Sequence, residues 1–315
     1  MTEVSDISGV GSKTSEKLEE NGYQTIKSVA KTNPETLNQR TGLSEKKSKT
    51  IIDNAREHLA TGGTRFSKGK KMKEQQNKLG KISTGSEKLD KLLGGGVPTN
   101  YTTEAFAEAG GGKTQLAHTL SVNVQKPVEE GGLNGKALFI DTENTFMPDR
   151  IEQIAEAAGM DPEQALDNIY VARSNDSDEQ MELVDDASKL CAQDNIKLIV
   201  VDGLMSHFRA EYHGRGELGD RQDKLGTHLR NLQELAKTYD LAVYYTNQVL
   251  SDPGQMFGDP TKAIGGNVVA HSSAFRLYLS PRGKKGYSAK LVDSPNLPPG
   301  EIMYDIKEEG ITDKE

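Results

Sequence analysis

Short apolar runs alternate with longer amphipathic stretches over most of the 315-residue chain. Four of the runs, at 137–141, 168–172, 197–202 and 241–246, are rich in Val, Ile, Leu and Tyr, which is typical of buried parallel strands. The stretch before the last run places apolar residues on one helical face: Leu225, Leu229, Leu232 and Ala236. This alternation predicts an α/β fold with a mostly parallel central sheet that helices cover on both sides.

The two ends of the chain follow other patterns. Three closely spaced apolar runs at 274–279, 288–292 and 302–306 predict antiparallel strands added at the C-terminus. Residues 1–60 contain short helical patterns around glycine turns and predict a small all-helical domain. We therefore expect a helical domain at 1–60, a linker at 61–78 and an α/β core at 79–315.

The N-terminal turns have a composition suited to phosphate. Gly9 and Gly11 flank a tight turn followed by Lys13, and a weaker copy lies at 41–46. Exposed backbone N–H groups beside a lysine can hold one DNA phosphate, so the two turns predict a helix-hairpin-helix pair that binds DNA without reading sequence. Each copy alone is nearly as well explained as a tight turn between helices.

The linker combines glycines and lysines with one aromatic residue, Phe66. An exposed aromatic in such a segment is suited to docking on another subunit, although it could equally pack on its own domain. The net charge of the whole chain is -8, which would argue against nucleic-acid binding if the charge were evenly spread. The lysines gathered in the linker show that the charge is not evenly spread.

Bulk composition limits the cellular setting. Mean hydropathy is -0.65, no apolar run reaches membrane length, and residues 1–6 lack the features of a signal peptide. The single cysteine, Cys191, excludes an intramolecular disulfide and is expected to be a small buried side chain. We expect a cytoplasmic protein with no membrane partner.

The most informative motif is a glycine-rich segment between a predicted strand at 101–106 and a predicted helix from 116. Such a loop binds nucleotide phosphates: Lys113 reaches the β and γ oxygens and Thr114 ligates Mg²⁺. The predicted loop residues are Ala107, Glu108, Ala109, Gly110, Gly111, Gly112, Lys113, Thr114 and Gln115. Ala107 replaces the first glycine of the full pattern, which would cost about 1–2 kcal/mol if that position needs a positive φ. An ordinary glycine-rich turn is the alternative.

Polar residues end three of the predicted strands. Asp202 follows four apolar residues and is expected to hold the metal. Glu143, after the neighbouring strand, is the candidate to orient the attacking water, and Gln248 is a candidate sensor of the γ-phosphate. An acid at a strand end can also simply cap the next helix, and Gln248 can be a surface glutamine.

Two loops at the same sheet edge, 207–217 and 250–266, combine cations, rings and glycines. Arg209, Arg215, Lys262, Tyr212 and Phe257 supply the charges and stacking surfaces of a single-strand DNA channel. Taken alone, long loops are more often lids.

Together these motifs resemble the RecA-like recombinases of archaea and eukaryotes, most closely the archaeal RadA branch. The segments that carry the resemblance are 94–96, 112–118, 141–146, 206–209, 214–216, 246–249, 264–267 and 293–298. The resemblance spans nearly the whole chain, including the helical domain.

The resemblance implies an ATP- and Mg²⁺-dependent filament or ring of this chain on single-stranded DNA that pairs with double-stranded DNA and exchanges strands, assisted by recombination mediators. It implies ATP bound between subunits. By this likeness the nucleotide site also includes Arg150, His271, Asp293 and Pro298. The second DNA loop includes Met256, Phe257, Lys262, Gly265 and Gly266. Subunit docking is mediated by Phe66 with Gly69.

Three departures from the family leave alternatives open. Ala107 lies in the loop, Met147 replaces a usual arginine, and Gly203 replaces a usual serine after Asp202. They motivate a second hypothesis, a recombinase paralogue that binds ATP and DNA as an accessory module with little turnover. A ring-forming regulatory ATPase or helicase of the same superfamily is a third.

Overall fold

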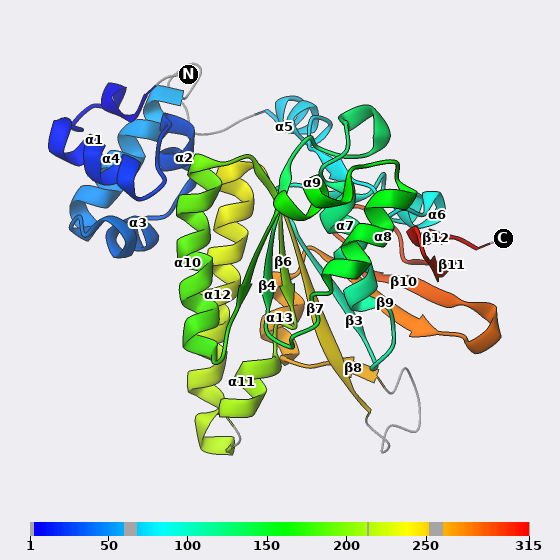
Figure 1. The fold of residues 1–315 in the computed structure, drawn as a ribbon. Helices are drawn as coiled ribbons and strands as arrows, with labels where there is room; N and C mark the ends of the chain where they lie inside the picture. The colour runs from blue at the N-terminus through cyan, green and yellow to red at the C-terminus, as the bar shows by residue number, and fades with distance from the viewer. Residues whose placement is uncertain (1–2, 60–67, 213, 252–260, 315) are drawn as a thin grey trace.

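A ten-stranded sheet forms the centre of the larger part of the protein. The helices nearest the N-terminus form a separate group beside it (Figure 1). The computed structural model describes residues 3–59, 68–212, 214–251 and 261–314. Among these residues, no helix combines the length and the apolar character needed to cross a membrane.

Six strands of the sheet run parallel, in the spatial order β5, β4, β6, β7, β3, β9. They are β3 (Thr102–Ala107), β4 (Lys136–Asp141), β5 (Ile169–Arg173), β6 (Ile196–Asp202), β7 (Ala242–Ser251) and β9 (Phe275–Pro281). Antiparallel strands β10 (Tyr287–Asp293), β11 (Gly300–Lys307) and β12 (Gly310–Asp313) extend one edge, β8 (Thr261–Ala263) pairs with the end of β7, and β1 (Lys81–Ile82) pairs with β2 (Val97–Pro98). The predicted fold class is confirmed.

Helices cover both faces of the sheet because successive strand residues point to opposite sides. Tyr244 joins the apolar cluster beneath α7, and its neighbour Tyr245 joins the cluster beneath α12. On the first face lie α6 (Glu87–Leu92), α7 (Lys113–Asn123), α8 (Pro148–Ala157) and α9 (Pro162–Asp167); on the second lie α10 (Ser177–Gln193), α11 (Ser206–Glu211), α12 (Leu218–Tyr239) and α13 (Gly266–Ser272).

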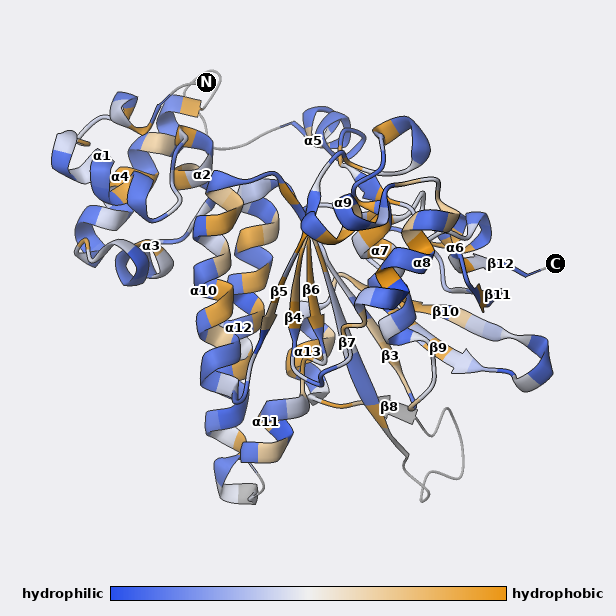
Figure 2. Cartoon of the chain, in the orientation of Figure 1, coloured by the Kyte–Doolittle hydropathy of each residue, from blue (hydrophilic) through white to orange (hydrophobic). Residues whose placement is uncertain are grey.

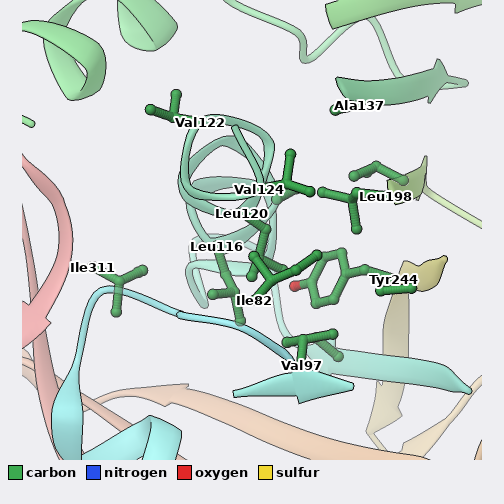
Figure 3. Packing of buried hydrophobic residues seen from close by; sticks show 14 of the residues in the cluster. Ile82, Val97, Leu116, Leu120, Val122, Val124, Ala137, Leu198, Tyr244 and Ile311 are labelled. Carbon is green, nitrogen blue, oxygen red and sulfur yellow. The ribbon is translucent and has the colours of Figure 1, made fainter. Parts of the chain in front are cut away.

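Apolar residues concentrate on the strands and on the inward sides of these helices (Figure 2). Leu116 and Leu120 of α7 belong to one apolar cluster with Leu198 of β6 and Tyr244 of β7 (Figure 3). Cys191 lies in the cluster on the opposite face, where burial raises the pKa of its thiol to about 12. A thiol this buried is an apolar packing group, as the sequence predicted.

The N-terminal helices pack around a core of their own. They are α1 (Ser12–Glu20), α2 (Ile26–Lys31), α3 (Pro34–Thr41) and α4 (Glu45–Leu59), preceded by a 3₁₀ turn at Val4–Asp6. In the larger part of the protein, 3₁₀ turns lie at Val128–Glu130, Arg215–Glu217 and Gly283–Lys285. Gly9 precedes α1 and Gly42 separates α3 from α4, both with positive φ, so glycine is needed at each turn.

These helices dock on α12 through polar contacts. Glu234 of α12 accepts hydrogen bonds from Asn33 Nδ2 at 2.7 Å and from Thr36 Oγ1 at 2.9 Å. Asp240, which follows α12, pairs with Lys31 at 2.8 Å. The two parts are therefore joined by charged and hydroxyl groups as well as by the connecting segment.

The expected linker contains a helix that the sequence did not predict, α5 (Gly69–Gln76). Its residues are polar almost all round and all exposed, so no apolar stripe marks it in the sequence. Gly69 is its first residue, and Phe66 lies outside the described residues.

Candidate nucleotide and DNA site

The glycine-rich segment joins β3 to the N-terminus of α7, as the sequence predicted. Gly110 and Gly112 have φ of 74° and 89°, conformations that favour glycine, and Gly112 caps α7. Lys113 Nζ donates to the carbonyl oxygens of Ala107 at 3.2 Å and Glu108 at 3.1 Å. Burial lowers the pKa of Lys113, and the carboxylates of Asp202 and Glu143 oppose that shift. The ammonium is thus held at the mouth of the loop.

The backbone of Ala107 does not have the positive φ that would strain an alanine at this position. Ala107 is the last residue of β3 and is fully buried. The loop turns after it, at Gly110, so the missing glycine costs no left-handed conformation at this position.

Asp202, at the end of β6, meets Thr114 from the loop. Thr114 Oγ1 and Thr145 Oγ1 each donate to Oδ2 of Asp202 at 2.8 Å, and Thr246 donates to Oδ1. A carboxylate and a hydroxyl at this separation are hard oxygen ligands of the kind that Mg²⁺ prefers, so the residues fit the metal expected here.

Glu143 lies at the centre of a chain of hydrogen bonds. Gln248 Nε2 donates to Oε1 of Glu143 at 3.1 Å, and Arg209 donates to Oε1 of Gln248 at 3.4 Å. Ser206, the first residue of α11, donates to Glu143 at 2.5 Å. The sequence named Glu143 and Gln248 as separate candidates, and the structure brings them into contact; Ser206 was not anticipated.

A cavity of about 520 Å³ joins these groups. Lys113 and Glu143 line it on the nucleotide side, and Arg209, Tyr212 and Arg221 line it toward α11 and α12. Arg221 was not predicted from the sequence because the DNA candidates were taken from loops, and Arg221 lies in a helical pattern twelve residues after Arg209. The cavity places an acid suited to orienting water near three side chains suited to DNA.

A second, more open cavity of about 790 Å³ lies over the loop. Loop residues 110–115 and Arg150 line it, and Arg150 Nε donates to Gln115 at 2.8 Å. The rest of its wall was missed and consists of Gln153, Tyr287, Ile306, Lys307 and Glu308. Gln153 follows Arg150 by three residues on α8 and could have been found by that spacing, whereas Tyr287 and Ile306 come from strands that only the fold brings near.

Other predicted nucleotide residues lie away from this chain's own loop. His271 on α13, Asp293 at the end of β10 and Pro298 are exposed and line neither cavity. Their exposure suits residues that would face a second subunit, and their role stays a prediction.

The loop predicted to be the second DNA loop is described only at its ends. Gly265 and Gly266 have φ of 96° and 60° at the start of α13, and Lys262 lies in β8. Met256 and Phe257 lie outside the described residues, and Arg215 begins the 3₁₀ turn after α11. In the helical part, Gly9, Gly11 and Lys13 form an exposed turn at the start of α1.

An apolar pocket of about 290 Å³ opens beside β5, at the outer edge of the sheet. Its lining residues come from β4, β5 and α10: Leu138, Ile140, Tyr170, Val171, Ala172, Leu183, Asp186, Ala187 and Leu190. Tyr170 and Val171 are unusually exposed for their type. Strand β5 has no neighbour on its far side among the described residues, so this edge can receive another chain.

Comparison with known proteins gives matches over almost the whole sequence. The profile of the Rad51 family matches residues 75–314, and that of the SAM-like helix-hairpin-helix tandem matches residues 1–57. The DNA repair and recombination protein RadA of Aeropyrum pernix is 45% identical over 314 residues, covering 99% of this chain and 97% of that protein. The protein of the same name from Cenarchaeum symbiosum is 43% identical over 316 residues, covering 99% of this chain and 79% of that protein.

Proposed function

The chain belongs to the Rad51 family, and we propose that it is a DNA-dependent ATPase that assembles on single-stranded DNA, pairs it with homologous duplex and exchanges strands. One observation carries the proposal. The Gln248 amide makes two hydrogen bonds across one cavity. Its nitrogen donates to Glu143, which lies beside the phosphate loop, and its oxygen accepts from Arg209, which lies on the proposed DNA side. Nucleotide chemistry and DNA contact are therefore linked by two hydrogen bonds.

ATP would bind with its phosphates in the 107–115 loop and its base toward Arg150. Lys113 would exchange its two loop carbonyl partners for β and γ oxygens, which carry full negative charge. Thr114 and Asp202 would hold Mg²⁺, which would neutralise charge developing on the phosphates. The hydroxyls of Thr145 and Thr246 keep the carboxylate of Asp202 oriented toward the loop.

Glu143 would orient the attacking water and accept its proton. Its carboxylate is exposed to the cavity, and it follows the strand that neighbours the one ending in Asp202. Gln248 would sense the γ-phosphate, since its amide already contacts Glu143. Phosphoryl transfer needs positioning and charge stabilisation more than covalent chemistry, and Lys113, Glu143 and Gln248 are suited to both.

Single-stranded DNA would cross the edge of the sheet at α11 and the two loops. Arg209, Tyr212 and Arg221 line the cavity there, which offers cations for phosphates and a ring for stacking. We assign Arg215, Met256, Phe257, Lys262, Gly265 and Gly266 to the same channel, and Gly9, Gly11 and Lys13 to a backbone contact with duplex.

Self-assembly would place Phe66 of one subunit in the apolar pocket beside β5 of the next, with Gly69 starting the helix that follows. The pocket volume of about 290 Å³ accommodates one aromatic side chain and its neighbours. His271, Asp293 and Pro298 would then reach the nucleotide of the adjacent subunit, since they do not line the cavities of their own.

The accessory-module alternative has little support. Ala107 lies unstrained in β3, and Met147 is 54% exposed and lines neither cavity. Lys113, Glu143 and Gln248 are arranged around one site. We therefore favour a catalytically active recombinase.

The replacement Glu143→Gln tests the proposal. It keeps the hydrogen-bonding shape of the side chain but removes the base, so ATP hydrolysis with single-stranded DNA should fall at least about a hundredfold. Binding of ATP and DNA should be retained. Unchanged hydrolysis would remove Glu143 from its role.

A further inference from the structure

Two donors from different elements fix one oxygen of Glu143. Ser206 Oγ and Gln248 Nε2 both donate to Oε1, at 2.5 Å and 3.1 Å. Within the described residues, no hydrogen bond reaches Oε2. A carboxylate whose first oxygen is held by two donors presents its second oxygen in a defined direction, which is what a base that accepts a proton from water requires.

Gly203 leaves the space in which this arrangement fits. A Cβ built on Gly203 would lie 2.7 Å from Oε1 of Glu143, so that carboxylate would have to shift, and 3.0 Å from Oγ of Ser206, which is a tight contact. The φ of Gly203 is not in the left-handed region, so its backbone does not require glycine. The lack of a side chain therefore serves the contact between Ser206 and Glu143.

Helix α11 carries both connections to Glu143. Ser206 begins the helix and contacts Glu143 directly. Arg209, three residues later, donates to Gln248, which is the second donor to Glu143. Any displacement of α11 changes both hydrogen bonds, and Arg209 on that helix faces the cavity assigned to DNA.

We propose that Ser206 is a positioning residue for Glu143, and that Gly203 is needed because a side chain there would displace their hydrogen bond. The proposal rests on the function proposed above, in which Glu143 orients water. Ser206 touches neither ATP nor DNA in this account; it sets the direction of Glu143 and transmits movement of α11 to it.

The test compares steady-state ATP hydrolysis of the full chain with and without single-stranded DNA. Ser206→Ala should lower kcat with DNA by at least about tenfold, the factor that one hydrogen bond to a charged group supplies. The KM for ATP and the Kd for single-stranded DNA should change less than about twofold, because the hydroxyl contacts neither ligand. These two constants also establish that the variant is folded.

Four further variants separate positioning from general damage. Gly203→Ala should reproduce the loss, and the double variant should be no slower than either single variant, because both changes remove the same contact. Ser206→Thr keeps a hydroxyl and should restore most of the rate. Ser188→Ala, which removes a helix hydroxyl bonded to its own helix backbone, is the matched control and should behave as wild type.

The outcomes distinguish this proposal from the proposed function. If Glu143→Gln is inactive while Ser206→Ala keeps the wild-type kcat, positioning by Ser206 is wrong and the ATPase assignment stands. A loss in Ser206→Ala that comes with weakened ATP binding, or that Ser206→Thr does not restore, also overturns it. If Glu143→Gln hydrolyses ATP normally, or the wild type hydrolyses none on DNA, both proposals fall.

Discussion

The methyl group of Ala107 occupies the space that a side chain on Gly111 would need: a Cβ built on Gly111 would lie 2.4 Å from it. Ala107 is fully buried at the end of β3 and cannot retreat. Ala107, which departs from the usual loop pattern, therefore leaves no space for a side chain at position 111, and that position must be glycine. The effect of Ala107 lies in packing and not in backbone strain.

We expect Gly111→Ala to weaken ATP binding by at least about fivefold, because overpacking by one methyl costs roughly 1–3 kcal/mol and the loop must move to accept it. Equilibrium titration with ATP measures the effect. Ala107→Gly should bind ATP much as wild type does, and adding it to Gly111→Ala should recover part of the loss. Wild-type affinity in Gly111→Ala would contradict this packing account.

Assembly through Phe66 gives a prediction about mixtures. Phe66→Ala should not form filaments, and neither should Ala172→Asp, which puts a charge in the apolar pocket. Mixed in equal amounts, the two variants should form pairs and nothing longer, since only one intact contact is available. Analytical ultracentrifugation separates pairs from monomers.

The matched control for assembly is Val128→Asp, which places the same charge on an exposed apolar residue outside the pocket. It should form filaments as wild type does. Filaments of Ala172→Asp alone, seen by electron microscopy with DNA, would show that the pocket beside β5 is not the docking site.

The contact between the helical part and α12 depends on Glu234. Its side chain is almost completely buried and accepts hydrogen bonds from Asn33 and Thr36. Glu234→Ala leaves those donors without their acceptor, so the free energy of unfolding should fall by about 1–3 kcal/mol. Arg230→Ala, which removes an exposed ion pair with Glu35 in the same interface, should cost less than about 1 kcal/mol. Urea unfolding measures both, and equal losses would contradict the assignment.

Two buried histidines predict how stability depends on pH. Burial lowers the pKa of His228 and of His118 to about 4. Each therefore stays neutral when folded at pH values where the unfolded chain, with an ordinary histidine pKa near 6.5, takes up a proton. Stability should thus be complete above about pH 6.5 and should decline as the pH falls toward 4.

The decline should approach about 1.4 kcal/mol per pH unit for each histidine between about pH 6 and 5, before most carboxylates titrate. His228→Gln should remove one of the two contributions and halve the slope, whatever its effect on stability at neutral pH. Chemical unfolding at about pH 7, 6 and 5 measures the slope. A wild-type stability that does not change over this range would contradict the burial argument.

Most of the fold followed from local patterns in the sequence. The apolar runs predicted the parallel strands and the added C-terminal strands, because a buried strand must be apolar whatever its partners. The glycine-rich loop and the polar ends of β4, β6 and β7 predicted one site, because parallel strands bring their carboxyl ends to the same edge.

What the sequence did not predict depends on non-local packing. Tyr287 and Ile306 reach the cavity over the 107–115 loop only because β10 and β11 extend the sheet on that side. Ser206 became relevant once α11 placed its hydroxyl against Glu143. The conformation of Ala107 could not be read from its identity, and α5 has no apolar stripe to mark it.

The most direct test of the central claim is steady-state ATP hydrolysis by the wild-type chain and by Lys113→Ala, each with and without single-stranded DNA. The account predicts hydrolysis that DNA stimulates strongly in the wild type and that Lys113→Ala abolishes, because the ammonium at the loop mouth is needed to hold the β and γ phosphates. Tight ATP binding with no stimulation by DNA would contradict it and would favour an accessory, non-catalytic member of the family.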